Sequence, residues 1–325
     1  MKKNGLKIAA LLVCLALLCT GCGGGGDNEP TTTAPTTTTT TLPPTTLAPT
    51  TTDKSEARDG LLVNCPDGKT IDAELLARLS GVCRTHDGEL SVYYKDLVTG
   101  YSVEYRADEI YQTASVIKAP YVKYLMESGV DQTKKLKMTK KQGGSKYIDN
   151  QPLGTEFTVG ELMEYAIRYS DNTAYYMLNQ EFGFKGFNEY AESIGVSSNA
   201  TRACVLQFPK PRFGYLSARD AGLYFEDIAR FIEKGSDDAK KLKTWLTSTT
   251  AAGQFTAALG ETYAVAHKYG EQGSQAYHDA AIVYAPHPYV LVITSTLEPY
   301  TDASNKVFKD VALYVDAIQT QLHQG

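Results

Sequence analysis

The chain has 325 residues, a formal net charge of −5 and a 42% share of hydrophobic residues. The acidic balance argues against a broad nucleic-acid surface, which needs clustered Lys and Arg. The histidines and cysteines are scattered without the spacing of a metal site, so we expect neither a metal nor another cofactor.

Residues 1–21 show the order of an export signal. Three lysines lie within the first seven residues, and an apolar run over 8–18 follows, too short to span a bilayer comfortably as a mature helix. The run ends in small residues directly before Cys22, an arrangement that resembles a bacterial lipoprotein cleavage site. We therefore predict a lipoprotein signal peptide over 1–21 and lipidation of Cys22. An ordinary signal peptide cut near Gly21 is the alternative.

Residues 22–52 are a glycine run followed by a stretch of almost only Thr, Pro and Ala. Such a segment cannot bury enough apolar surface to offset the entropy cost of ordering, so we predict a disordered linker that spaces a domain from the membrane. No second apolar segment is long enough to span a bilayer. We expect the protein on the extracytoplasmic side of the cell membrane, attached through its lipid anchor alone.

Residues 53–325 are long enough for one large domain. Apolar periodicity and alternation predict its elements in chain order. The predicted helices are 71–84, 114–126, a helix through Tyr169 that follows a capping-box sequence at Thr158, 172–182, 218–232 and 305–322. The predicted strands are 90–97, 101–105, 263–268, 276–284 and 289–296.

These elements predict an α+β fold, because helices and strands at both ends of the chain bracket a helical middle. The simplest packing is one five-stranded antiparallel sheet built from both ends and flanked by the terminal helices. An all-helical lobe is then inserted between the second and third strands. We expect a cleft between the sheet and the lobe, which is a common place for a functional site.

The cysteines of the mature chain fit an oxidising compartment. Cys65 and Cys83 flank a short segment and can form a disulfide there. Cys204 is expected to be buried and inert. The sequence does not fix this pairing, so three separate thiols remain the alternative.

Three short motifs carry the candidate chemistry: S-x-x-K at 115–118, S-D-N at 170–172, and Lys-Tyr-Gly, close to K-T-G, at 268–270. A serine hydroxyl is a weak nucleophile that needs a base. Residues three apart on a helix share one face, so Lys118 can reach the Ser115 oxygen. A lysine acts as that base only when burial or a nearby cation lowers its pKa.

A second group of atoms can stabilise the developing oxyanion. Ser115 lies at a predicted helix start, where backbone N–H groups lack helical partners. Its own N–H and the N–H of Glu271 are candidates for an oxyanion hole.

Each motif has a plainer explanation when it is taken alone. S-x-x-K occurs by chance at a helix start, S-D-N is a good helix cap, and Lys-Tyr-Gly indicates only a strand end with a turn. The three motifs in this order, each on the expected element, favour a shared site.

With these motifs, residues 90–322 resemble the class A β-lactamase and penicillin-binding superfamily. The stretch 158–183 is especially similar to the helices around the family's S-D-N motif, and 268–296 resembles its K-T-G strand and the following hairpin. The resemblance implies a β-lactamase-like fold for 53–325 and a serine acyl-enzyme. It also implies a β-lactam or a peptidoglycan peptide as substrate. We expect a monomer without a nucleic-acid partner.

The resemblance also implies residue roles. Ser115 is the acylated serine, Lys118 is its base, and Ser170 relays a proton to the leaving nitrogen. Asn172 positions the substrate amide, and Lys268 attracts the substrate carboxylate.

Two departures from the family pattern concern deacylation and ligand choice. The family's β-lactamases activate the deacylating water with a glutamate in a loop after S-D-N, but the corresponding residues 199–215 contain no Asp or Glu. We therefore expect slow deacylation, since a lost general base costs about 10²–10⁴-fold. Tyr269 replaces the threonine that binds the ligand carboxylate, so Tyr269, Gly270 and Glu271 are expected to line an altered substrate site.

Two other functions remain open at this point. A non-catalytic surface lipoprotein with this fold would bind wall peptide or a partner. An esterase or amidase would use the same serine on unrelated substrates.

Overall fold

The computed structural model describes residues 55–58, 60–66, 68–144, 147–196, 214–250 and 253–324. They lie in a unit that spans Thr50–Gly325. The predicted signal peptide, Cys22, the linker 22–52 and Cys204 lie outside the described residues, so these interpretations stay predictions.

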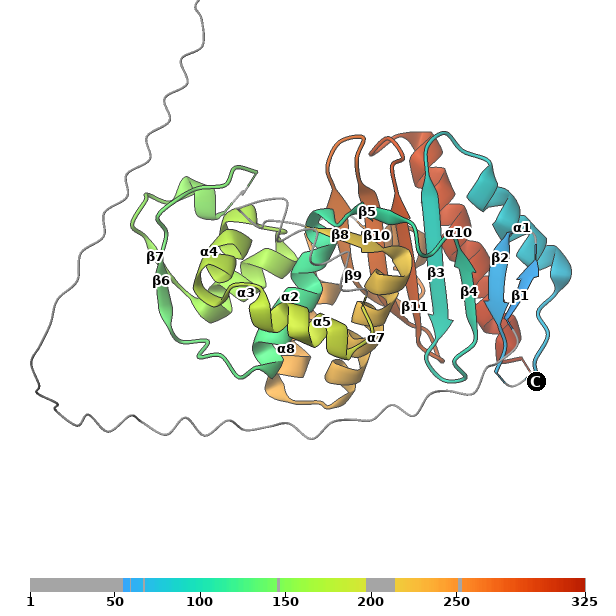
Figure 1. The fold of residues 1–325 in the computed structure, drawn as a ribbon, viewed down its shortest axis with the longest axis horizontal. Helices are drawn as coiled ribbons and strands as arrows, with labels where there is room; N and C mark the ends of the chain where they lie inside the picture. Colours follow the sequence, from blue (N-terminus) through green and yellow to red (C-terminus); the bar gives the residue numbers. More distant parts are fainter. Residues whose placement is uncertain are drawn as a thin grey trace, which may run out of the picture. The chain divides into compact units, whose positions relative to one another are not determined.

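A seven-stranded antiparallel sheet forms the centre of this unit, in the order β1-β2-β4-β3-β11-β10-β9 (Figure 1). Its strands are β1 (Ser55–Arg58), β2 (Leu61–Asn64), β3 (Leu90–Asp96), β4 (Ser102–Tyr105), β9 (Ala264–Glu271), β10 (Tyr277–Tyr284) and β11 (Tyr289–Ser295).

The predicted count of five strands was wrong because it missed the hairpin of β1 and β2. The other five strands occur where the sequence predicted them. The apolar run of β2 is only Leu61-Leu62-Val63, with Leu61 and Val63 buried and Leu62 exposed. A run this short gives too weak an alternation signal to separate a strand from a turn.

The sheet is buried on both faces. Val290 and Val292 of β11 pack toward one hydrophobic core and Leu291 and Ile293 toward the other, as the period of two in a strand requires. The second core lies under the terminal helices α1 (Ala73–Arg84) and α10 (Asp302–Leu322) and the short α9 (Gln254–Leu259). On the other face, α7 (Ala218–Glu233) packs on β3, β10 and β11.

The helical lobe lies between β4 and β9 in the chain, as predicted (Figure 1). Its helices are η1 (Ala114–Ile117), α2 (Lys118–Glu127), η2 (Ile148–Asn150), α3 (Val159–Arg168), α4 (Asn172–Phe182), α5 (Lys185–Ser193), α7 and α8 (Asp237–Thr247). The prediction of an all-helical lobe was wrong in one respect, because the lobe also contains two short strand pairs. They are β5 (Ile110–Gln112) with β8 (Tyr215–Ser217) and β6 (Lys135–Lys137) with β7 (Glu156–Thr158). The helices α5, α8 and α9 were not predicted.

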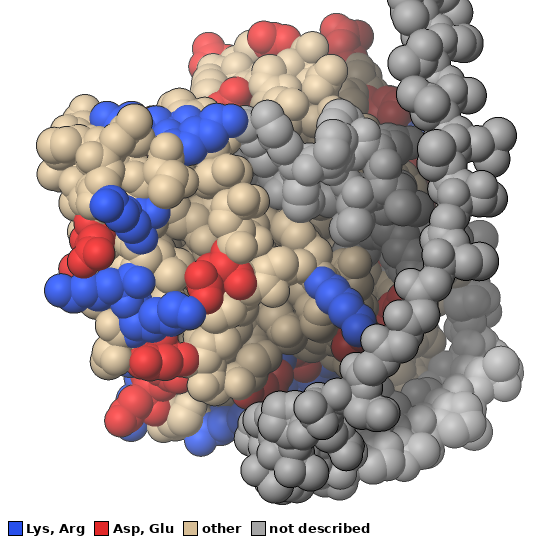
Figure 2. All heavy atoms as spheres, turned by 60° about the vertical axis from the view of Figure 1, so that its left-hand side comes forward, with Lys and Arg blue, Asp and Glu red and all other residues tan. Residues whose placement is uncertain are grey.

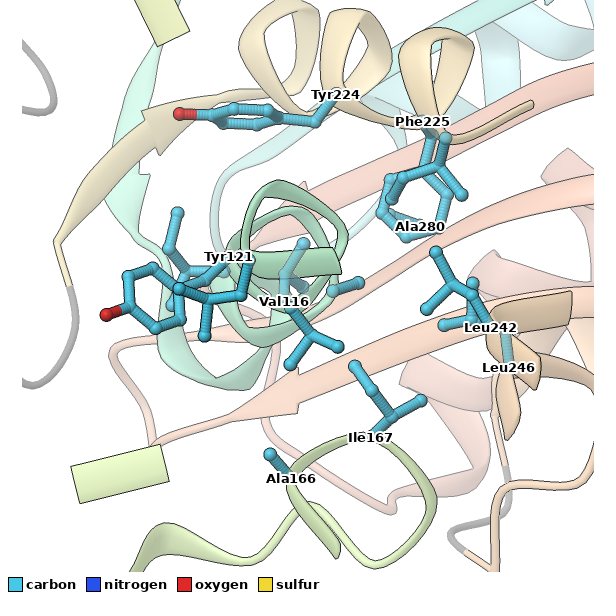
Figure 3. Close-up of a cluster of buried hydrophobic side chains, with 14 of the residues drawn as sticks. Val116, Tyr121, Ala166, Ile167, Tyr224, Phe225, Leu242, Leu246 and Ala280 are labelled. Atoms are coloured by element: carbon cyan, nitrogen blue, oxygen red, sulfur yellow. The ribbon is translucent and has the colours of Figure 1, made fainter. Parts of the chain in front are cut away.

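One continuous core joins the lobe to the sheet. Val116 on η1, Ile167 on α3 and Leu246 on α8 converge there with Phe225 on α7 and Ala280 on β10 (Figure 3). This packing holds the residues around Ser115 against the sheet.

Local signals explain where the lobe's central helix begins. The Thr158 side chain accepts from the backbone N–H of Glu161, and the Glu161 carboxylate accepts from the N–H of Thr158 at 2.7 Å. This is the predicted capping box, worth about 1 kcal/mol.

The structure does not join Cys65 to Cys83 in a disulfide. Cys83 is buried, and the Cys65 thiol donates to the backbone oxygen of Lys69.

Within the described ranges, no helix has the length and apolar character needed to cross a membrane.

Charged side chains of both signs are interspersed on the face of the lobe that Figure 2 shows. Ion pairs in the lobe include Lys134 with Glu181 at 2.5 Å and Lys241 with Asp238 at 3.2 Å. Exposed pairs of this kind contribute roughly 0–1 kcal/mol each.

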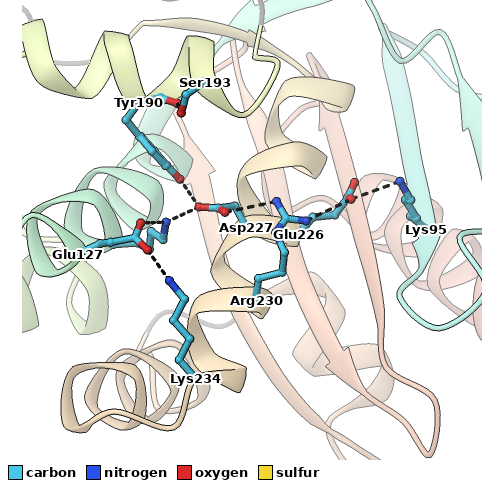
Figure 4. A network of polar contacts seen from close by, with 9 residues as sticks. Lys95, Glu127, Tyr190, Ser193, Glu226, Asp227, Arg230 and Lys234 are labelled. Atoms are coloured by element: carbon cyan, nitrogen blue, oxygen red, sulfur yellow. Dashed lines mark hydrogen bonds and ion pairs between the residues drawn. The ribbon is translucent and has the colours of Figure 1, made fainter. Parts of the chain in front are cut away.

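A buried network links α2 to α7. The Lys123 ammonium is 2% exposed and donates to Glu127 of its own helix and to Asp227 of α7. Tyr190 also donates to Asp227, and Lys234 donates to Glu127 (Figure 4). Because α2 directly follows η1, this network fixes the helix that carries Lys118.

We predict that Lys123→Met destabilises the protein by about 3 kcal/mol, because it leaves two carboxylates without their buried cation. The measurement is the free energy of unfolding in urea. Lys234→Met is the matched control: its side chain is 58% exposed, so it should cost less than about 1 kcal/mol. Equal losses of unfolding free energy in Lys123→Met and Lys234→Met would contradict the stabilising role of the buried Lys123.

Candidate active site

Ser115 lies in η1, directly before α2, and is half-buried. The preceding residue, Ala114, has φ 42°, a left-handed conformation that is strained for a residue with a side chain. Such strain costs on the order of 1–3 kcal/mol and collects at functional sites. Nothing in the sequence signalled it.

The open edge of β9 lies against η1. A Cβ on Gly270 would come within 2.9 Å of the Ser115 backbone nitrogen and 3.0 Å of the Ala114 Cβ. Only glycine therefore allows the strand to approach the serine this closely. The sequence predicted Gly270 as a site residue by resemblance, and this close approach gives the physical reason for it.

The backbone of Glu271 faces the same edge. Gln272 donates its N–H to Ala276 O, on the β10 side. Successive N–H groups of a strand point in opposite directions, so the N–H of Glu271 points away from β10. This is the direction that the predicted oxyanion hole needs.

Lys118 is completely buried one helical turn after Ser115. Its Nζ donates to Ser170 O at 2.6 Å and to Asn172 Oδ1 at 2.7 Å, and lies 3.4 Å from Ser170 Oγ. The first and second motifs are therefore in direct contact.

Lys268 brings the third motif to the same serine. Its side chain is 1% exposed, and its Nζ donates to Ser170 Oγ at 2.9 Å and to Tyr269 O at 3.1 Å. Ser170 itself has φ 53°, a second strained backbone in the site. The Ser170 hydroxyl thus lies between two lysines, one from the lobe and one from the sheet.

The pKa values of both lysines are lowered by their surroundings. Burial, followed by the charge of Lys268, holds the pKa of Lys118 well below its usual range, with Asp171 acting in the opposite direction. Burial lowers the pKa of Lys268 to about 7, and Asp279 opposes this shift. At neutral pH the site therefore holds fewer than two ammonium ions.

The S-D-N segment combines a structural and a site role. The Asp171 carboxylate caps α4 by accepting from the N–H of Ala174 at 2.8 Å. Asn172, the first residue of α4, offers its oxygen to Lys118 and donates Nδ2 to Gly143 O at 3.3 Å. Asp171 therefore acts as a helix cap, as the motif taken alone would suggest. Ser170 and Asn172 instead bond the site lysines, Lys118 and Lys268.

Tyr269 lies on the opposite face of β9 from Lys268, as the alternation of a strand requires. Its side chain is half-buried and forms a hydrogen bond with Tyr300. The Tyr300 hydroxyl also donates to Glu271 Oε2 at 3.3 Å, and its backbone has φ 62°. The Tyr269 ring also lies beside the site lysine, with Lys268 Nζ 5.0 Å from the ring centroid. A role of Tyr269 in substrate binding stays a prediction.

His278 was not singled out in the sequence, although it pairs with Gly270 across β9 and β10. Its Nδ1 accepts from the N–H of Ser295 at 3.0 Å, so its Nε2 must carry the proton donated to Gln112 O at 2.7 Å. Burial lowers the pKa of His278 to about 4, which keeps the ring neutral. The ring anchors the strand that leads to Ser115.

The described residues contain no group of three or more His, Cys, Asp or Glu side chains that could hold a metal ion. The grouped side chains are hydroxyls, amines and an amide. They can deprotonate an alcohol, donate a proton to a leaving group and attract an anion.

This fold and this group of side chains define a serine hydrolase. The chain belongs to the beta-lactamase enzyme family, whose model matches residues 71–317.

Individual relatives agree with this membership. The chain is 28% identical over 241 residues to a beta-lactamase of Mycobacterium tuberculosis, covering 69% of this chain and 78% of the relative. It is 26% identical over 243 residues to a beta-lactamase of Amycolatopsis lactamdurans, covering 70% and 79% of the two chains.

Solved structures share the fold. PBP-A matches with a TM-score of 0.65 and 23% identity, over 79% of this chain and all of the other. A class A beta-lactamase from Mycobacterium abscessus matches with a TM-score of 0.61 and 23% identity, over 76% and 99% of the chains. The loop 199–215, predicted to lack a general base, lies outside the described residues except for its last two positions.

We predict that Lys268 makes stability rise with pH between 7 and 9. Its folded pKa, about 7, lies below the usual 10.5, so the unfolded chain binds more protons in this window. The difference in unfolding free energy between wild type and Lys268→Met should grow by about 2 kcal/mol over two pH units.

Urea unfolding at each pH gives this difference. Lys240→Met, at a lysine that is 71% exposed, is the matched control and should run parallel to wild type. If Lys268→Met also ran parallel, the lowered pKa would be contradicted.

Proposed function

We propose that this protein is an exported, lipid-anchored serine acyl-enzyme that acts on β-lactams or on D-amino-acid peptides of the cell wall. One observation carries the proposal: two buried lysines meet at the Ser170 hydroxyl, and one of them follows Ser115 by a single helical turn. The beta-lactamase relatives favour β-lactams, and one similar structure, a PBP-A mutant, is described as an acyl-enzyme complex with penicillin G.

Lys118 is suited to be the base for Ser115. A neutral amine has two N–H bonds and one lone pair, and the acceptors Ser170 O and Asn172 Oδ1 match its two N–H bonds. The lone pair can then accept the proton of Ser115 as its oxygen attacks a carbonyl carbon. Burial and the charge of Lys268 lower the pKa of Lys118, which favours this neutral form relative to a free lysine.

The remaining groups act on the tetrahedral intermediate and the leaving group. The N–H groups of Ser115 and Glu271 would stabilise the oxyanion. Ser170 would pass a proton to the leaving nitrogen and regain one from protonated Lys118. The Lys268 ammonium polarises the Ser170 hydroxyl at 2.9 Å and would attract a substrate carboxylate.

Deacylation is proposed to be slow. A water molecule needs a base to attack the acyl-enzyme, and residues 199–215 contain no Asp or Glu; their only amides are Asn199 and Gln207. Neither amide accepts a proton at neutral pH. Release would then depend on Lys118 or on an acceptor other than water.

We predict that benzylpenicillin forms an adduct on Ser115 that intact-mass spectrometry detects and that decays slowly. Loss of a dedicated base should make hydrolysis of the adduct about 10²–10⁴-fold slower than hydrolysis assisted by a positioned carboxylate. Ser115→Ala, the control, should show no adduct.

Rapid turnover of penicillin would contradict slow deacylation while supporting the acyl-enzyme. Absence of both adduct and hydrolysis, for penicillin and for D-alanyl peptides, would contradict the proposed substrates. Labelling by chromogenic esters alone would then favour an esterase.

For the location, we predict that Cys22→Ser moves the protein from the membrane fraction to the soluble fraction, because the substitution removes the thiol that would carry the lipid. Immunoblots of the two fractions measure this. Cys19→Ser is the matched control and should leave the protein in the membrane fraction; the same distribution for wild type and Cys22→Ser would contradict the lipid anchor.

A further inference from the structure

A buried histidine directly precedes Lys268 in β9. The exposed fraction of His267 is 2%, and its Nδ1 lies 2.9 Å from Asp279 Oδ1. An ionised carboxylate can only accept, so Nδ1 carries a proton. The Nε2, 2.8 Å from Thr249 Oγ1, accepts from that hydroxyl when the ring is neutral.

Three neighbours fix the imidazole ring of His267: Asp279, Thr249 and the backbone at Gly253. Asp279 Oδ2 accepts from the backbone N–H of Phe255 at 3.0 Å, which holds the carboxylate at the start of α9. A Cβ on Gly253 would overlap the His267 ring, so the backbone there packs directly on the imidazole. His267 therefore holds Thr249 at a defined place beside β9.

The next residue continues the contact into the lobe. Thr250 donates its backbone N–H to Arg168 O at 2.9 Å and its hydroxyl to the same oxygen at 3.3 Å. Arg168 ends α3, two residues before Ser170. Thr249 and Thr250 follow α8, which packs on β9 (Figure 1). They thus link His267, the residue before Lys268, to the end of α3, which leads to Ser170.

We propose that His267 is a positioning residue that holds Lys268 in contact with Ser170, with Thr249-Thr250 as the tie between sheet and lobe. The proposal rests on the proposed acyl-transfer function, because it concerns the same site. The Lys268–Ser170 hydrogen bond crosses from the sheet to the lobe, and this tie makes a second crossing beside it.

The order of hydroxyl, imidazole and carboxylate is also that of a catalytic triad. Here the imidazole is enclosed by Gly253, Asp279 and Thr249, and Thr249 is followed by a residue that bonds the lobe. These contacts favour a positioning role over a second nucleophile.

The test is Thr249→Val, which keeps the shape of the side chain and removes the hydroxyl that His267 holds. We expect acylation of Ser115 by penicillin to slow about tenfold at saturating ligand, with little change in the half-saturating concentration. The pH profile should also shift near pH 7, because Lys268 titrates there. Thr249→Ser restores the hydroxyl and should recover the wild-type rate.

Thr247→Val is the matched control. Its hydroxyl bonds Lys243 O within the exposed side of α8, so acylation should not change. Equal rates for Thr249→Val and wild type, or equal losses in Thr249→Val and Thr247→Val, would overturn the proposal. Covalent labelling of Thr249 by a fluorophosphonate would overturn it in favour of a second catalytic serine-type site.

A readout without substrate separates this proposal from the proposed function. The titration of Lys268, followed by NMR of labelled lysine side chains, should shift its midpoint in Thr249→Val and return in Thr249→Ser. An unchanged midpoint would overturn the tie even if penicillin acylates Ser115. A shifted midpoint would support it even if penicillin does not react.

Discussion

The burial of two lysines around one serine hydroxyl is the constraint on which the site depends. Each ammonium ion taken out of water is costly, and placing two of them near each other adds repulsion. The protein accommodates them with acceptors for Lys118, with the Ser170 hydroxyl for Lys268, and with the charge of Asp279. The same burial that makes the lysines costly lowers the pKa of Lys118, one helical turn after Ser115, which is the condition that the proposed base needs.

The fold was largely predictable because its long elements carry strong periodic signals. β3, β10, β11 and α10 were predicted within a few residues of their observed bounds. The misses are short or atypical. β2 offers only three apolar residues, and α8 carries three lysines and two aspartates around buried Leu242 and Leu246, so its apolar face is narrow. In both places tertiary packing rather than local pattern decides the structure.

The site was predictable where chemistry follows from residue type and spacing. Lys118 bonds Ser170 and Asn172, and Lys268 bonds Ser170. Ser115 lies against Gly270 of β9, and the catalytic roles of these residues stay predictions. The strained φ of Ala114, the neutral ring of His278 and the His267–Asp279 pair could not be predicted, because each depends on partners far away in sequence. Tyr269 shows the same limit: residue type suggested a bulky group in the substrate site, but not its hydrogen bond with Tyr300 or the position of its ring 5.0 Å from Lys268 Nζ.

The insertion of the lobe between β4 and β9 has a consequence for how a nascent chain matures. β3 pairs with β11, so the pairing of Val92 can form only after Ile293 has been synthesised. In addition, β9 joins the sheet only through β10. Contacts this distant in sequence slow folding, since a long loop must close before they form. A polypeptide that stalls before β11 would contain Ser115, Lys118 and β9, but it would lack the strand that joins the β9–β10 hairpin to β3. The contact between Lys268 and Ser170 would then form only near the end of synthesis, long after Ser115 has been made.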